Sequence, residues 1–246
     1  ARVWGCASCV YRYITEEMDE KVKHLVAYSD TCGGQNRNFN FASLWLYSVH
    51  TSNVDCVDHK FMYSGHSFLP NDHEYGSIKQ KKRNVGAVYV PEQWRELVKS
   101  ARRHKPFIVK EMEQHHFKTF SPIRSQLINR KRNTVGDKVG WMKIQWMRFT
   151  KEHPWDMQYK HSHSELEPWK TVIFKKNGWG RPADLSQVQP SQLYKEARQI
   201  TKAKYNDLMS LFAYIPPVHH GFYLTLKPGD SVPLEENIEM GDEEEH

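Results

Sequence analysis

The 246-residue chain contains few cysteines and no long apolar run. Four cysteines in a chain of this length do not make a disulfide scaffold, which favours a reducing compartment. Apolar runs stay well short of the roughly 18 residues that a membrane-spanning helix needs, so no membrane span is expected. The first residues, 1–5, have neither the basic start nor the apolar run of a signal peptide. Because the sequence starts without Met, we expect it to be a fragment of a longer protein.

The charge is distributed unevenly along the chain. Residues 235–246 carry seven acidic side chains and no Lys or Arg. Without them, 35 basic side chains face 22 acidic ones, a formal charge of +13 on residues 1–234. A basic body favours a polyanionic partner such as nucleic acid, and the acidic tail is expected to be disordered and to screen that surface. The 39% of hydrophobic residues is enough for a folded core and excludes wholesale disorder.

The first part of the chain alternates between helical and strand patterns. Helices are predicted over residues 6–17, 36–50 and 71–80 and from Pro91 onward, and strands over residues 24–30, 56–63, 86–90 and 107–112. Residues 36–50 contain an apolar stretch that is too long for a strand and are therefore predicted to be a buried helix. This alternation favours an α/β fold with a largely parallel sheet.

Directly after Val139 the sequence pattern changes from alternating helices and strands to strands alone. Two alternating stretches, 139–149 and 171–176, predict a separate β-rich lobe, and residues 178–190 are expected to be a linker. Residues 192–213 predict an amphipathic helix that stops at Pro216. The expected organisation is a core portion (1–112), a β-rich lobe or insertion plus linker (113–190), a C-terminal helix and return segment (191–230) and an acidic disordered tail (231–246).

Two carboxylates occupy positions that a metal-dependent nuclease would use. Asp30 lies at the carboxyl end of one predicted strand, and Asp72 follows the end of the next. In an open α/β sheet the carboxyl ends of neighbouring strands face one crevice. Two such carboxylates can bind Mg²⁺ or Mn²⁺, which activate a nucleophile and stabilise the leaving oxygen in phosphoryl transfer. Alternatively, Asp30 caps the following turn and Asp72 belongs to a helix cap.

The residues around these carboxylates carry a resemblance to a known family. Residues 29–38 (SDTCGGQNRN) and 65–72 (GHSFLPND) resemble a mostly uncharacterised transposon-derived family of animal genomes, whose members look like RNase-H-like transposases with a DDE-type acid triad. Weaker similarities at 91–94, 207–208, 214–217 and 222–223 extend it over most of residues 1–226. The resemblance implies an RNase-H-like core that acts on DNA in the nucleus, and we expect this core to lack its first strands.

An RNase-H fold begins with a three-strand meander, and its first catalytic Asp lies on the first strand. Here a helix follows Asp30 directly, so Asp30 resembles the second acid of the triad and Asp72 the third. The first acid is then expected upstream of Ala1. Glu74 is an alternative third acid, and Asp207 is a poorer one. His66 could orient a metal-bound water, although a lone His is more often structural.

Departures from the family pattern support a second hypothesis. Gly5 stands where the family carries Glu, and Lys79 stands where Glu is usual. Either change is typical of a domesticated copy that keeps the fold and binds DNA or another partner without cutting it. The chain is therefore predicted to be either a DNA nuclease/strand-transferase domain or a catalytically inactive DNA-binding or interaction protein. Self-association into a homo-oligomer is left open.

The remaining candidates are weaker. Basic clusters beside the acids are expected to follow a phosphate backbone; they comprise Lys81, Lys82, Arg83, Arg102, Arg103, Arg130, Lys131 and Arg132. Cys6, Cys9, Cys32 and Cys56 fit no common zinc-finger spacing. Trp141, Trp146 and Trp155 could stack on unpaired bases, but core packing is the favoured role.

Overall fold

The computed structural model describes residues 2–63, 70–128, 131–176, 184–196 and 198–229. The chain forms two compact units. Unit 1 comprises Ala1–Ser67 and Glu113–Lys195 together with the terminal Glu236–His246, and unit 2 comprises Phe68–Met112 and Glu196–Glu235. Among the helices in the described ranges, none combines the length and the apolar character that a membrane crossing needs.

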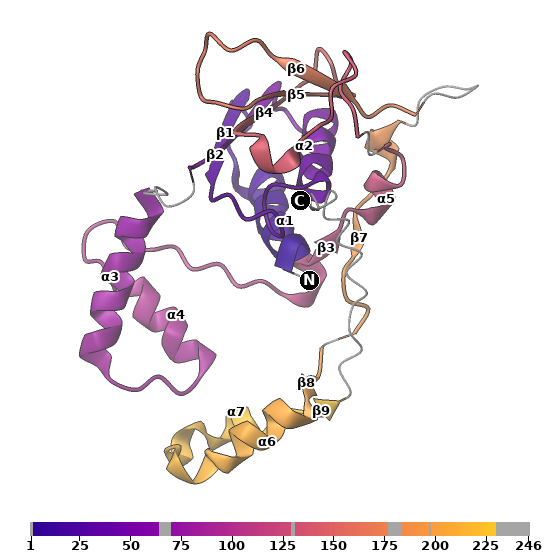
Figure 1. The fold of residues 1–246 in the computed structure, drawn as a ribbon. Helices are drawn as coiled ribbons and strands as arrows, with labels where there is room; N and C mark the ends of the chain where they lie inside the picture. Colours follow the sequence, from indigo (N-terminus) through magenta and orange to yellow (C-terminus); the bar gives the residue numbers. More distant parts are fainter. Residues whose placement is uncertain (1, 64–69, 129–130, 177–183, 197, 230–246) are drawn as a thin grey trace, which may run out of the picture. The chain divides into compact units, whose positions relative to one another are not determined.

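Unit 1 is built on one five-stranded mixed sheet (Figure 1). Its strands, in spatial order, are β1 (His24–Ser29), β2 (Cys56–Phe61), β4 (Trp146–Thr150), β5 (Asp156–Lys160) and β6 (Lys170–Ile173). Only β1 and β2 run parallel, and every later pairing is antiparallel. The α/β class is confirmed, but the prediction of a largely parallel sheet is wrong. The reason is the short connections between β4, β5 and β6, which permit only antiparallel hairpins.

Helix α2 (Phe39–Thr51) covers one face of this sheet. Every residue from Phe39 to Val49 is buried, which confirms the prediction of a buried helix. The side chain of Asn38 begins the helix by accepting a hydrogen bond from the N–H of Phe41. Helix α1 (Arg2–Arg12), which continues as a π-helical segment η1 (Tyr13–Glu17), packs beside α2.

The strands after Val139 do not form a separate lobe. Both β4 and β6 belong to the sheet that holds β1 and β2, and β4 pairs directly with β2. The inward side chains of β4 and β5, among them Met147 and Tyr159, complete the core beneath α2. Smaller elements of unit 1 are η2 (Gln114–His116), β3 (Lys118–Thr119), α5 (Ser121–Arg124), η3 (Trp141–Lys143), η4 (Leu185–Gln187) and β7 (Ser191–Gln192), with β3 and β7 paired.

Unit 2 is mostly helical. It contains α3 (Pro70–Val85), α4 (Pro91–Lys99), β8 (Ile200–Thr201), α6 (Lys202–Ser210), η5 (Phe212–Tyr214), η6 (Pro217–His219), α7 (His220–Leu224) and β9 (Pro228–Gly229). A small second core joins Val90 to Ile215 and Tyr223. The Tyr223 hydroxyl donates to the carbonyl of Tyr89, which ties the segment before α4 to α7.

Two predicted strands of unit 2 are not strands. Residues 86–90 form no ladder, because the N–H groups of Tyr89 and Val90 donate to the side chain of Gln93 instead. Residues 107–112 are also extended without a ladder partner in the described chain. By contrast, α3 runs to Val85, five residues beyond its predicted end at Gln80.

The amphipathic helix predicted over 192–213 is shorter than expected. Residues 191–192 pair with β3 and the N–H of Leu193 donates to Phe117, so only Lys202–Ser210 is α-helical before the turn at Phe212. Four predicted features lie outside the described residues, wholly or in part: His66, Arg130, the acidic tail 231–246, and residues 178–183 of the linker.

Candidate functional site

The carboxyl ends of β1 and β2 lie side by side in unit 1. Their parallel register pairs Ser29 with Phe61, and the N–H of Met62 donates to the Ser29 carbonyl at 2.9 Å. Asp30 therefore leaves the sheet at the edge where neighbouring parallel strands both end. This is the position in an α/β sheet at which ligands are usually bound.

A hydrogen-bond chain fixes the end of β1 to the core. The indole N–H of Trp45 donates to Nδ1 of the buried His59 at 2.9 Å, so this nitrogen is the acceptor of the ring. The neutral ring then carries its proton on Nε2, which donates to the Ser29 hydroxyl at 2.9 Å. The hydroxyl donates in turn to the Asp30 carbonyl. Burial lowers the pKa of His59 to about 3, which keeps the ring neutral at physiological pH.

This tautomer has a chemical consequence for Ser29. A serine nucleophile needs a basic nitrogen that can accept its proton. Nε2 of His59 already carries a proton, and Nδ1 is engaged by Trp45. The Ser29–His59 pair is thus a structural support and not a nucleophilic dyad.

The Asp30 carboxylate is exposed, and hydrogen bonds from described residues engage only one of its two oxygens. Its Oδ1 accepts hydrogen bonds from the N–H of Cys32 at 3.2 Å and from the Asn36 side chain at 2.8 Å. No described residue donates to the other oxygen, Oδ2. Asp30 therefore closes the turn that follows it, as the capping interpretation predicted, and still presents one carboxylate oxygen to a ligand.

Arg37 and Asn38 hold the loop after Asp30 in a single shape. The buried guanidinium of Arg37 donates to the carbonyls of Ile144 and Thr31, and Asn38 donates to the carbonyl of Gly33. Nε of Arg37 is buried without a described partner. Burial lowers the pKa of Arg37, but the guanidinium remains a cation. The loop at residues 29–38 is thus held by side-chain hydrogen bonds where it leads into α2.

The other candidate acids belong to unit 2. Asp72 is exposed in the first turn of α3, which agrees with the predicted helix start. Glu74, two residues further along, forms an ion pair with Arg102. We expect the Asp30 and Asp72 carboxylates to share metal ions and therefore to lie about 4–8 Å apart, as in two-metal sites. Because the two residues belong to different units, this separation stays a prediction.

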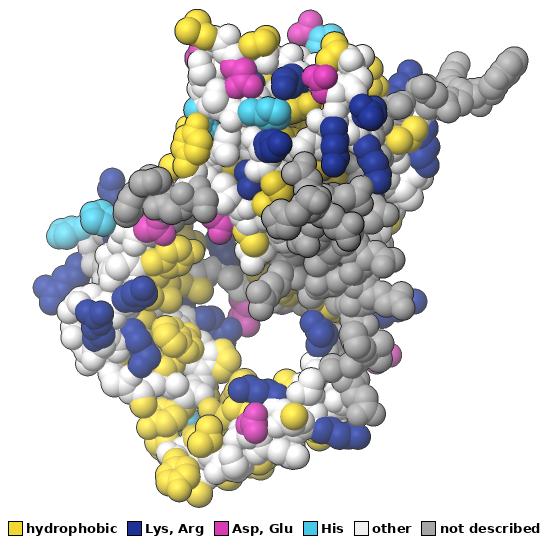
Figure 2. Space-filling model, in the orientation of Figure 1, with side chains coloured by type: hydrophobic (Ala, Val, Ile, Leu, Met, Phe, Trp, Pro, Cys, Tyr) yellow, Lys and Arg dark blue, Asp and Glu magenta, His cyan; other side chains and the backbone are white. Residues whose placement is uncertain are grey.

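The basic residues named from the sequence fall in both units. Figure 2 shows Lys and Arg side chains gathered over α3, where Lys79, Lys81, Lys82 and Arg83 follow one another. Arg103 is exposed after α4, whereas Arg102 is engaged by Glu74. In unit 1, Lys131 and Arg132 are exposed.

Sequence reasoning missed a buried charge network on the open face of the unit 1 sheet. The Asp58 carboxylate is 1% exposed. It accepts two hydrogen bonds from Arg148, at 2.7 and 2.8 Å, one from Trp146 at 2.7 Å and one from His24 at 2.7 Å. The signal available was the Asp within the apolar run of β2, since a charge in a buried strand needs a partner.

His24, Cys56 and Asp58 also lie close enough to hold a metal ion, with one ligand atom of each within 4.8 Å of the others. The donor set does not fit Mg²⁺, which prefers oxygen ligands. Both Asp58 oxygens are already occupied, and the Arg148 cation bound to them repels a second cation. Burial raises the pKa of the Cys56 thiol, and the Asp58 charge adds to this, which disfavours the thiolate. The Asp58 carboxylate instead links three strands through hydrogen bonds from His24 in β1 and from Trp146 and Arg148 in β4.

The structure places the three candidate tryptophans in packing roles. Trp146 is 2% exposed, and Trp141 and Trp155 pack against the main core, so none is an open stacking platform in unit 1. All four cysteines are free thiols, and among them only Cys56 belongs to the group with His24 and Asp58 that could hold a metal ion.

Comparisons of the chain with protein-family models, with curated proteins and with solved structures give no match.

Proposed function

We propose that the chain is a transposase-derived DNA nuclease/strand-transferase domain that uses divalent metal ions for phosphoryl transfer. The observation that carries this proposal is the position of Asp30. It is exposed at the carboxyl end of a strand that runs parallel to its neighbour, and its Oδ2 has no partner among the described residues. The resemblance of residues 29–38 and 65–72 to the transposon-derived family supports the same function.

One residue of the described site, Asp30, has the ligand chemistry that a hard divalent cation needs. Asp30 supplies a free carboxylate oxygen, the ligand type that Mg²⁺ and Mn²⁺ prefer, and Asp72 is the proposed second ligand. When bound, such ions would activate the attacking oxygen and stabilise the leaving one. The protein's own contribution is positioning: the Trp45–His59–Ser29 chain fixes the backbone at Asp30, and Asn36 orients the carboxylate. Glu74 is a weaker candidate for the third acid because Arg102 engages it.

A binding assay for Mn²⁺ tests the metal site directly. Asp30→Asn should weaken Mn²⁺ binding to the 246-residue chain by at least tenfold, since the amide keeps the shape of the carboxylate but loses its charge. Asp19→Asn is the matched control, because Asp19 is also exposed and caps its own turn through Lys21 at 2.9 Å. Equal Mn²⁺ affinity in wild type and Asp30→Asn would remove Asp30 from the metal site.

The second function is a catalytically inactive DNA-binding protein. Two observations favour it. Asn36 and the N–H of Cys32 donate hydrogen bonds to Oδ1 of Asp30, so this oxygen has partners without a metal ion. The buried Arg37 is a cation in the same loop and would repel a metal ion. A plasmid-nicking assay with Mg²⁺ or Mn²⁺ separates the two functions when it uses the intact protein that carries the expected upstream acid. Residues 1–246 alone are expected to be inactive in this assay. Nicking that Asp30→Asn abolishes supports the nuclease. DNA binding without nicking in either metal supports the inactive binder.

A further inference from the structure

Helix α3 carries a polar stripe that no ion pair or core contact explains. None of its described side chains from Asp72 to Val85 is buried. His73, Ser77, Gln80, Lys81 and Asn84 recur at intervals of three and four residues and therefore share one face of the helix. A helix that is polar on this scale gains little from packing, so its composition needs another reason.

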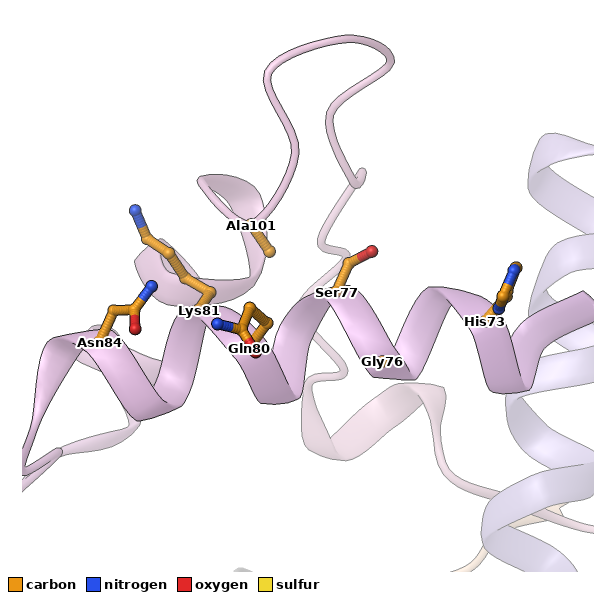
Figure 3. A pocket seen from close by; sticks show the side chains of 7 residues that line it. All are labelled: His73, Gly76, Ser77, Gln80, Lys81, Asn84 and Ala101. Carbon is orange, nitrogen blue, oxygen red and sulfur yellow. The ribbon is translucent and has the colours of Figure 1, made fainter.

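This face lines an open hollow of about 600 Å³ in unit 2. Its walls are the five stripe residues together with Gly76 and Ala101. Figure 3 shows Ser77, Lys81 and Asn84 pointing to the side of α3 on which Ala101 lies. The small side chain of Ala101 and the absent side chain of Gly76 leave this space open. A Cβ added at Gly76 would meet nothing within 4 Å.

The lining has the chemistry of an anion site. It offers the Lys81 ammonium, two side-chain amides, a hydroxyl and an imidazole, and it contains no carboxylate. Lys81 forms no ion pair with any described residue, and the same holds for its neighbours Lys79 and Arg83. The acidic Glu74 is turned to Arg102. A ligand with several negatively charged oxygens and an extended shape would satisfy these donors together.

We propose that the hollow along α3 binds the phosphodiester backbone of DNA. This inference rests on the proposed DNA function and deepens it, because it assigns a strand-binding groove to unit 2. Lys81 and its basic neighbours supply the charge, as phosphate contacts by Lys and Arg generally do. Gln80, Ser77 and Asn84 donate neutral hydrogen bonds to phosphate oxygens and hold the strand in register. Gly76 lets the strand approach the helix backbone.

The sharpest test is to fill the hollow without weakening the helix. Gly76→Leu places a side chain where the strand would lie, and Leu is a better helix former than Gly. The matched control is Gly221→Leu in α7, where the glycine is also helical and also has nothing within 4 Å of an added Cβ. Binding of a fluorescent 20-bp duplex to the full chain is measured by anisotropy at several salt concentrations, with helix content checked by circular dichroism.

Gly76→Leu should weaken DNA binding by about tenfold or more, comparable to the loss of one charge-assisted hydrogen bond. Gly221→Leu should bind like wild type. Lys81→Ala should weaken binding and lower the slope of log affinity against log salt by about 0.9, whereas Gln80→Ala should weaken binding with the slope unchanged.

The outcomes separate this proposal from the one on which it rests. Wild-type DNA binding that Gly76→Leu and Lys81→Ala leave unchanged overturns the groove while the proposed DNA function stands. A wild-type chain that binds no duplex at low salt overturns both. Tenfold tighter binding of an RNA duplex of equal length would overturn the assignment of DNA as the ligand.

Discussion

Replacing Asp58 with Asn should destabilise unit 1 severely. The carboxylate is 1% exposed and accepts four hydrogen bonds, two of them from Arg148. The amide of Asn keeps one acceptor oxygen and places N–H donors where the other oxygen faced donors. It also leaves the Arg148 cation, with 27% of its side chain exposed, without its counter-ion. Breaking a buried pair in this way costs about 3–5 kcal/mol of the free energy of unfolding.

The assay is urea unfolding of the full chain, followed by tryptophan fluorescence, since Trp146 is part of the network. Asp55→Asn is the control: Asp55 precedes β2 and pairs with Lys151, but 57% of its side chain is exposed, so its loss should cost about 1 kcal/mol or less. The double variant Asp58→Asn/Arg148→Met should recover part of the lost free energy of unfolding, because it also removes the Arg148 cation that has no counter-ion in Asp58→Asn. A loss below about 1 kcal/mol in Asp58→Asn would refute the claim that this network holds the sheet together.

The same network predicts a dependence on pH. Burial acts to raise the pKa of Asp58, but the hydrogen bonds from Arg148, Trp146 and His24 outweigh it, and the pKa lies below its usual value. A lowered pKa contributes stability that is fully present above the unfolded value of about 3.9 and is lost as the pH falls through the folded value. The contribution of Asp58 is therefore constant at neutral pH and is lost progressively as the pH falls below about 4 and through the folded value.

Three further predictions concern other residues. Because burial lowers the pKa of His59 to about 3, the unfolded chain takes up a proton below about pH 6.5 that the folded chain does not. Stability should therefore fall by up to about 1.4 kcal/mol per pH unit between these values. Urea titrations should show that His59→Gln removes this slope, and an unchanged slope would contradict the neutral state assigned to the His59 ring. Gly136→Ala should cost about 1 kcal/mol in thermal unfolding because Gly136 has φ +93°, whereas a neutral effect would show that the turn rearranges. DNA affinity of the chain should fall steeply with salt, and removal of residues 235–246 should strengthen binding at low salt; binding that salt leaves unchanged would contradict an electrostatic interaction.

The sequence was informative where apolar patterns met clear boundaries. Helix α2 was predicted because the apolar stretch within residues 39–49 is too long for a strand, and β1 and β2 because each is short and bounded by turn residues. The pattern could not show which strands pair. Residues 146–150 read as part of another lobe because their alternation is local information, while their partner β2 is distant in sequence.

The site was predicted in part. Asp30 was expected at a strand end and lies there, but the chain of Trp45, His59 and Ser29 behind it depends on tertiary contacts between α2, β1 and β2. The strand predicted at 86–90 failed for a similar reason. The side chain of Gln93 takes the backbone N–H groups that a neighbouring strand would otherwise receive, and a propensity pattern carries no record of that competition.

The pairing of β2 with β4 has a consequence for how the chain folds. The elements β1, α2 and β2 are contiguous in sequence and can assemble early, but the second edge of β2 is completed only by residues 146–150. During synthesis α3 and α4 of unit 2 therefore leave the ribosome before β4, and until β4 is made one edge of β2 has no paired strand. Non-local pairing of this kind slows folding and exposes a template for association with other chains. We therefore expect the unpaired edge of β2 to cause slow refolding and aggregation at high concentration. Chaperones should be needed most in the interval between the synthesis of β2 and that of β4.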